Sequence, residues 1–405
     1  MAETNYIEPI RDARKQLSVG KTILLGLQHT FTMFGSTVLV PLLTGTSVSV
    51  ALTMAGICTL LFHFITKFKM PVFLGSSFAF IGPTLAAAAA AGGGPEGLAY
   101  ACGGIVAAGI IYAIVAFLIY QYGVEKVVSF FPPIITGPII MVIGLTLAPT
   151  ATSMAAENWF LAIVAFLVVV AVNIYARGFL QIVPVLCGLV VGYIVAVITG
   201  NVDFTPIAEA AWFGLPDFQL AKFDIKIIAM VAPVAVATIV EHIGDVIAIG
   251  ATVEDDFLEE PGLHRTMLGD GIGTALSAMV GGPANTTYSE NTGVLALTRV
   301  WDPLVMRIAA IFAIILGGVP KIAALVSTIP GSVIGGMSIV LFGMIAAVGV
   351  RTLVENQVDF KQPRNLLIAA TILVLGLGGE VVPGGMALAA VIGIIMNKIL
   401  PGADS

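Results

Sequence analysis

The chain has 405 residues, of which 58% are hydrophobic and 10% charged, and its mean hydropathy is +1.04. A soluble domain contains roughly 25% charged residues, so this composition excludes a large soluble protein and predicts a polytopic membrane protein. The formal net charge of −6 is less informative, because orientation in a membrane depends on where Lys and Arg lie. Cys58, Cys102 and Cys187 stand alone in apolar segments, so we interpret them as packing residues and expect no metal and no cofactor.

Fourteen segments are apolar enough to cross a bilayer, which takes about 20 helical residues. Segments 72–91 and 284–298 are interrupted, and each is expected to contain a short strand that runs into a helix, the two strands being antiparallel. Irregular backbone at membrane depth is tolerated only where it is buried in protein or lines a cavity. The predicted fold is an all-α polytopic membrane protein, with segments at 22–44, 49–65, 72–91, 98–120, 127–147, 159–174, 179–199, 225–249, 265–280, 284–298, 304–326, 332–348, 365–377 and 384–399.

The basic residues support this number of segments. If the N-terminus is cytoplasmic, every second connection contains Lys or Arg, as the positive-inside rule requires. All but three of the 18 basic residues then fall on the cytoplasmic side, the exceptions being Lys222, Lys226 and Lys321. We therefore predict that both termini are cytoplasmic.

The two halves of the chain resemble each other at three places in the same order. Gln28-His29 matches Glu241-His242, residues 69–80 (KMPVFLGSSFAF) match 281–291 (GGPANTTYSEN), and residues 131–144 match 329–343. Chance similarity among Gly- and Pro-rich segments is the alternative. A seven-segment repeat is odd in number, so its second copy is inverted, and inverted repeats with broken helices are a transporter arrangement with a binding site near the midplane.

Four acidic residues lie inside predicted spans, and three of them are candidates for the site. Glu241 and Asp245 are four residues apart and share one helix face, and Glu290 stands where the helix of the tenth segment is expected to begin. A charge at the bilayer centre costs at least ~2.5–3.5 kcal/mol, which makes each residue a functional candidate. The alternative is that they pair for packing alone. Asp270 is also intramembrane, near the predicted cytoplasmic end of its helix, and is assigned no role.

The chemistry of this predicted site suits a planar base. The two interrupted segments provide helix starts with unpaired N–H groups, the carboxylates accept hydrogen bonds, and Phe78 and Tyr288 offer flat apolar faces. A pyrimidine or purine base matches these groups, whereas an anion would be repelled by Glu241 and Glu290. An anion exchanger is therefore less favoured, and the absence of HExxH, GxSxG or a paired catalytic Asp motif argues against an intramembrane enzyme.

The carboxylates also predict proton coupling. Two acidic groups near each other in a low-dielectric site do not readily ionise together, so a proton taken up with the substrate would couple transport to the proton gradient. Asp245 could relay or share this proton with Glu241 and Glu290, and a sodium site stays open as an alternative. Residues beside the polar face form a second tier of candidates: Gln28, His29, Ser77, His242 and Asn291.

The run Glu290-Asn291-Thr292-Gly293 through Thr298-Arg299 resembles the signature of the nucleobase–ascorbate transporter family, also called nucleobase:cation symporter-2. Within it, GSSFAF at 75–80, Gln28-His29, EHIGD at 241–245 and PGLHR at 261–265 are similar to bacterial uracil permeases, and the similarity covers essentially the whole chain.

This resemblance implies a homodimer in the bacterial cytoplasmic membrane, with fourteen spans in two inverted repeats. Residues 1–121 and 201–326 would form a core domain that moves against a gate domain of residues 122–200 and 327–405. Glu241 and Glu290 would bind the base, Phe78 would stack on it, backbone amides at Phe78 and Ser289 would meet its carbonyls, and Tyr288 would line the pocket.

Two positions depart from the uracil permease pattern, which has His in place of Asp245 and Gly in place of Ser289. Purine members of the family often have Asp at the first position, yet xanthine and urate transporters typically have Gln in place of Glu290. The resemblance favours a proton-coupled uracil symporter, with a purine-base proton symporter as the alternative and no nucleic-acid partner.

Overall fold

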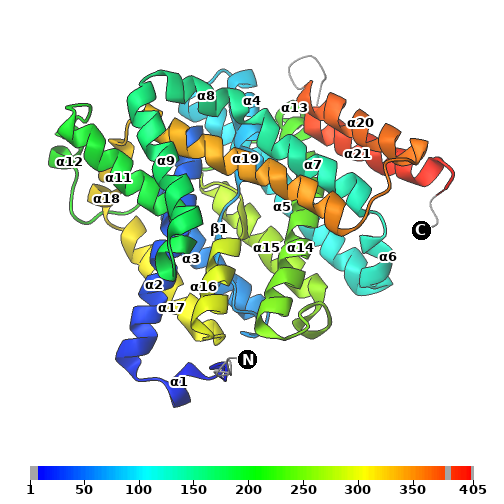
Figure 1. Cartoon of the computed structure of the whole chain (residues 1–405), viewed down its shortest axis with the longest axis horizontal. Coiled ribbons are helices and arrows are strands. Elements are labelled where there is room, and N and C mark those ends of the chain that lie inside the picture. The colour runs from blue at the N-terminus through cyan, green and yellow to red at the C-terminus, as the bar shows by residue number, and fades with distance from the viewer. Residues whose placement is uncertain (1–7, 379–384, 403–405) are drawn as a thin grey trace.

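A computed structural model describes residues 8–378 and 385–402, and these are mostly helical (Figure 1). The predictions for residues 1–7, 379–384 and 403–405 lie outside the described part. The first half contains α1 (Ala13–Gln16), α2 (Val19–Thr44), α3 (Val48–Ile65), β1 (Leu74–Ser76), the 3-10 helix η1 (Phe78–Phe80), α4 (Ile81–Ala90), α5 (Gly94–Tyr122), α6 (Val124–Val128), α7 (Pro133–Thr146), α8 (Ala148–Ala156), α9 (Trp159–Tyr175), α10 (Phe179–Ile182) and α11 (Pro184–Ile198).

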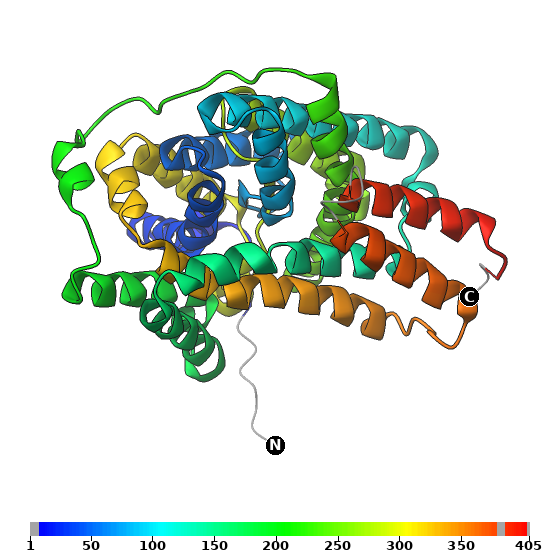
Figure 2. The same cartoon turned by 90° about the horizontal axis from the view of Figure 1, so that it is seen from above.

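The second half begins with a long connection that arches over one face of the molecule (Figure 2). Its elements are α12 (Thr205–Glu209), α13 (Ile225–Val231), the 3-10 helix η2 (Ala232–Val234), α14 (Ala235–Val253), the π-helical turn η3 (Leu258–Gly262), α15 (Leu263–Met279), β2 (Asn285–Thr287), α16 (Ser289–Thr298), α17 (Pro303–Gly317), α18 (Pro320–Ser327), α19 (Gly331–Glu355), α20 (Pro363–Leu377) and α21 (Gly385–Ile399).

Proline divides several segments that the sequence analysis treats as continuous. The residue before a proline is disfavoured in helical conformation, and α7, α11 and α18 each begin at a proline: Pro133, Pro184 and Pro320. As a result, predicted segments 127–147, 179–199 and 304–326 are each split, and α17 and α18 meet at an angle of 79°. Helix α8 is an additional element that no predicted segment contains.

Six helical runs among the described residues are long and apolar enough to cross a membrane, and α17 with α18 makes a seventh if the bent pair is one span. The six are Val19–Thr44, Val48–Ile65, Gly94–Tyr122, Pro133–Ala156, Ile225–Val253 and Gly331–Glu355. The described residues also contain five shorter apolar helices of 10–17 residues. The chain therefore has the character of a multi-pass membrane protein, and the number of fourteen spans stays a prediction.

The two interrupted segments meet as a pair of short antiparallel strands. In β1 and β2, Leu74 lies opposite Thr287 and Ser76 lies opposite Asn285. A threonine of a neighbouring helix fixes the start of each strand: the hydroxyl of Thr59 accepts from the Leu74 N–H at 2.9 Å, and that of Thr274 accepts from the Asn285 N–H at 3.2 Å. These bonds anchor irregular backbone in the interior of the bundle, where an unpaired N–H is costly.

The helices pack in two groups. Helices α2, α3, α4, α5, α14, α15, α16 and α17 pack around the strands or on one another, whereas α7, α8, α9, α10, α11, α19, α20 and α21 pack mainly on one another. Seen from above, the second group lies along one side of the first (Figure 2). Glycine permits a close approach at the α5–α15 crossing, since a Cβ on Gly109 would lie 2.5 Å from the carbonyl oxygen of Gly271.

Candidate binding site

Two helices begin directly after the paired strands. β1 leads through Ser77 into η1, and β2 leads through Tyr288 into α16; neither Ser77 nor Tyr288 caps its helix with its side chain. The first N–H groups of a helix have no intrahelical partner and lie at the positive end of its dipole. The hydroxyl of Ser77 is buried and has no partner among the described atoms. Both helix starts therefore retain hydrogen-bond donors.

Tyr288 forms part of the frame around these helix starts. It is buried, and its hydroxyl donates to the Ser76 carbonyl at 3.0 Å and accepts from the Thr37 hydroxyl at 3.3 Å. Its ring lies against Gly75, where an added Cβ would be 2.3 Å from two ring carbons. The structure thus places Tyr288 between β1 and α2, with its polar group already engaged.

The three predicted carboxylates lie close enough to interact electrostatically, but their partners differ. Glu290 accepts from the Ser36 hydroxyl of α2 at 2.7 Å. Asp245 accepts from the Thr287 hydroxyl at one carboxylate oxygen and from the Ser289 hydroxyl, at 3.4 Å, at the other.

Glu241 accepts no hydrogen bond from a described protein group at its carboxylate. It is nonetheless only half-buried, as are Asp245 and Glu290, so all three stay accessible inside an apolar bundle. A half-buried carboxylate needs donors, and those for Glu241 must come from a ligand or from water. The described residues contain no group of three His, Cys, Asp or Glu that could hold a metal ion.

The remaining predicted contact residues stand at the two helix starts. Phe78, the first residue of η1, is half-buried, and Ser289, the first of α16, is exposed. The second group of helices approaches here: a Cβ on Gly293 of α16 would be 3.4 Å from Ile182 of α10, and a Cβ on Gly82 of α4 would be 3.6 Å from Leu147. The candidate site therefore lies where the two groups of helices meet.

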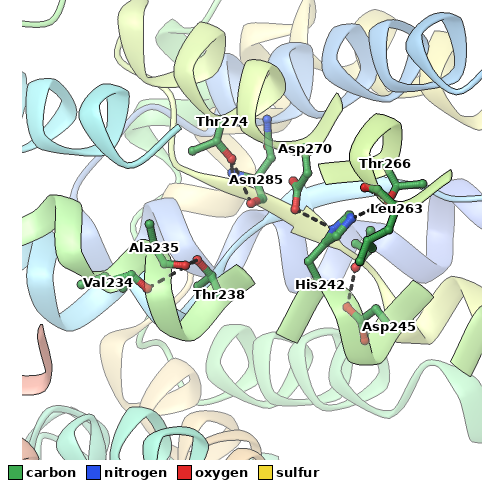
Figure 3. Close-up of polar contacts among 11 residues, drawn as sticks. Val234, Ala235, Thr238, His242, Asp245, Leu263, Thr266, Asp270, Thr274 and Asn285 are labelled. Carbon is green, nitrogen blue, oxygen red and sulfur yellow. Dashed lines mark hydrogen bonds and ion pairs between the residues drawn. The ribbon is translucent and has the colours of Figure 1, made fainter. Parts of the chain in front are cut away.

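His242 points to α15, where it forms a fully buried pair with Asp270 (Figure 3). The His242 Nδ1 lies 3.0 Å from an Asp270 carboxylate oxygen, and its Nε2 lies 3.1 Å from the Thr266 hydroxyl. That hydroxyl donates to the Leu263 carbonyl, so it accepts from Nε2–H. Asp270, which the sequence analysis places near a helix end without a role, lies instead in the middle of α15 behind Glu241.

A second buried pair lies behind Glu290. The Asn291 side-chain amide lies 3.1 Å from the His29 Nδ1 and donates to the His29 carbonyl at 3.2 Å, which links α16 to α2. Gln28 is half-buried beside it. The second-tier residues His29, His242 and Asn291 thus connect the helices of the site rather than reach its accessible side.

Sequence reasoning missed the hydroxyl groups that hold the site together. Ser36 and Thr37 of α2, Thr287 of β2 and Thr266 of α15 each bond to a predicted residue or its partner, yet Ser and Thr are common in apolar segments and carry no distinctive pattern. Among these residues, only the position of Thr287 could be anticipated from the sequence, because alternation along a strand places its side chain on the opposite face from that of Thr286.

An apolar helical bundle that crosses the membrane several times and gathers three accessible carboxylates beside two helix starts defines a membrane transport protein. The xanthine–uracil permease model, described as "Permease family", matches residues 20–385. The uracil permease of Bacillus caldolyticus is 45% identical, covering 98% of this chain and 95% of its own, and that of Bacillus subtilis is 42% identical, covering 94% and 93%. The chain therefore belongs to this permease family, as the resemblance predicts.

The solved transmembrane domain of BicA, a cyanobacterial bicarbonate transporter, shares the fold. It has a TM-score of 0.62 and 15% sequence identity, covering 97% of this chain and 100% of that one. At this identity the likeness concerns the fold alone.

Proposed function

We propose that the protein is a proton-coupled uracil symporter. The observation that carries this proposal is the carboxylate of Glu241, which is half-buried, has no donor among the described protein groups and lies within electrostatic range of Glu290 at the start of α16. Uracil presents two N–H groups and two carbonyls on a flat ring, so it supplies donors to a carboxylate and acceptors to backbone N–H groups. The uracil permeases with which the chain shares 40–45% identity support the same substrate.

In this proposal the two glutamates divide the N–H groups of the base. Glu241 accepts one N–H and Glu290, steadied by Ser36, accepts the other. The free N–H groups at Phe78 and Ser289 donate to the carbonyls, and the half-buried Phe78 ring stacks on the base. Tyr288 contributes by fixing the helix start, since its hydroxyl is occupied.

The same carboxylates provide proton coupling. Three acidic groups share one region of low dielectric, where like charges repel strongly. A proton bound on the outer side together with uracil relieves this repulsion, and its release inside returns the site to its empty state.

In this proposal, the conformational change that transports the substrate arises from two inverted seven-segment repeats. The Thr59–Leu74 and Thr274–Asn285 bonds occur at corresponding places in segments 2–3 and 9–10, which supports the repeat. We assign residues 1–121 and 201–326 to a core domain and residues 122–200 and 327–405 to a gate domain. Their relative movement alternates access in a homodimer of the bacterial cytoplasmic membrane, with both termini cytoplasmic and the proton as coupling ion.

A purine base is the second candidate, because Asp245 lies one turn from Glu241 on the same accessible face, where a larger base with further N–H groups would meet it. Anion exchange, as in transporters of the same fold, is disfavoured by three carboxylates at the site.

A competition-binding panel on the purified protein tests the proposal. Labelled uracil should be displaced by unlabelled uracil, weakly by thymine, and not by xanthine, hypoxanthine or guanine at the same concentration. Glu290→Gln should abolish binding, and Gly82→Ala, on the neighbouring helix α4, should retain it. Stronger displacement by xanthine than by uracil would instead establish the purine candidate.

A further inference from the structure

Asp245 is held from one side by β2 and the start of α16. Thr287, which is 3% exposed, donates to one of its carboxylate oxygens, and Ser289 donates to the other at 3.4 Å. Both donors belong to the strand–helix junction, whereas Asp245 belongs to α14. The two hydroxyls therefore tie α14 to the junction at the level of the site.

Other ionisable groups lie near Asp245, so its hydrogen bonds influence which carboxylate of the site is available to a ligand. Asp245 lies within electrostatic range of Glu241 on its own helix, of the buried His242–Asp270 pair between α14 and α15, and of Tyr112 on α5. Glu241 in turn lies within range of Glu290 on α16. Among the three accessible carboxylates, Glu290 has one hydroxyl donor, Asp245 has two and Glu241 has none among the described groups. A carboxylate with its own donors is fixed in place, while one without them is free to bind a ligand.

We propose that Thr287, assisted by Ser289, is a positioning residue that holds Asp245 as part of the protein frame and so leaves Glu241 as the carboxylate that meets the base. This inference rests on the proposed function for its effect on uracil, but the tie itself is independent of the substrate. It also gives Ser289, which departs from the uracil permease pattern, a role through Asp245.

Thr287→Val tests the proposal, because valine has nearly the shape of threonine and lacks the hydroxyl. A hydrogen bond to a charged group is strong enough that its loss should weaken uracil binding about tenfold or more. The pH profile of uracil uptake should also change, since a released Asp245 would compete with Glu241 for the coupling proton. Thr287→Ser retains the hydroxyl, so its uracil affinity should lie within about threefold of the wild type and its pH profile should match the wild type. Ser289→Ala should change both quantities in the same direction as Thr287→Val but by less, because the hydrogen bond from Ser289 to Asp245 is longer than that from Thr287.

A second measurement keeps the tie testable without any substrate. The carboxyl infrared band of Asp245, assigned by its loss in Asp245→Asn, should titrate at a different pH in Thr287→Val than in the wild type and Thr287→Ser. Identical titration in all three, with unchanged uracil affinity and pH profile, would overturn the inference. If the wild type bound no uracil but the band still shifted, the proposed function would fail while the role of Thr287 stood.

Discussion

At the scale of single residues, the accessible carboxylates depend on groups that lie behind them. His242 follows Glu241 directly in sequence but points to the opposite side, where Asp270 and Thr266 hold it without solvent access (Figure 3). This fixes the rotation of α14 about its axis and therefore the direction in which Glu241 and Asp245 point. The pair thus contributes to the site although neither member reaches it.

Breaking this buried pair should destabilise the protein strongly. His242→Leu leaves the Asp270 carboxylate buried without a partner, which costs about 3–5 kcal/mol, whereas replacing both residues by leucine removes the unpaired charge and should cost much less. Thermal unfolding of the solubilised protein measures both variants. A double variant as unstable as the sum of the two single variants would contradict a direct interaction.

The exposed pair of Lys222 and Glu96, with its atoms 2.6 Å apart, is the matched control. At neutral pH, Glu96→Gln should leave the unfolding temperature nearly unchanged, because exposed ion pairs contribute little.

The sequence is sufficient to single out Glu241, Asp245 and Glu290 as candidates, because a carboxylate in an apolar span is conspicuous. It could not assign their partners, since Ser36, Thr287 and Thr266 are ordinary residues whose role depends on contacts between distant segments. Asp270 could be recognised from the sequence as an intramembrane acid, but its structural role could not be assigned, because that role depends on the position of His242 on a different helix.

At the scale of elements, the junction of β1 with Tyr288 leaves no room for a side chain. A Cβ on Gly75 would overlap the Tyr288 ring at 2.3 Å, and the ring cannot move without losing its bonds to Ser76 and Thr37.

Gly75→Ala should therefore disturb both the crossing of the strands and the start of α16. Overpacking of this kind costs about 1–3 kcal/mol, and we expect at least a tenfold loss of uracil binding, measured by competition. Gly82→Ala is the control, since its Cβ would meet nothing closer than 3.6 Å. Equal binding by both variants would show that the contact of Tyr288 with Gly75 is unimportant.

Element positions could largely be predicted because apolar length and polar interruptions are local properties. The two strands occur inside the segments 72–91 and 284–298 for this reason. The breaks at Pro133, Pro184 and Pro320 were missed because hydropathy stays high across them, although proline itself was a usable signal. Helix α8 was missed because its nine residues are too few to be recognised as a membrane span.

At the scale of the whole molecule, the proposed transport requires the two groups of helices to move against each other. Gly293 of α16 and Ile182 of α10 lie on either side of their boundary, and a Cβ on Gly293 would be 3.4 Å from the Ile182 side chain. In a background lacking Cys187, the pair Gly293→Cys and Ile182→Cys should block uracil uptake when oxidised and recover when reduced.

A cross-link inside one group provides the comparison. A Cβ on Gly192 of α11 would lie 3.3 Å from that of Ala165 on α9, and both helices belong to the proposed gate. The pair Gly192→Cys and Ala165→Cys should leave uptake close to that of the reduced protein. Full transport by the oxidised Gly293–Ile182 pair would exclude movement at this boundary.

The most direct measurement is uptake of labelled uracil by the purified protein in proteoliposomes, with the internal pH recorded at the same time. With an inward proton gradient, uracil should accumulate, external uracil should drive protons inward, and both signals should vanish with a protonophore and in Glu241→Gln. Uptake that ignores the proton gradient, or that persists at the wild-type level in Glu241→Gln, would contradict a proton-coupled uracil symporter centred on Glu241.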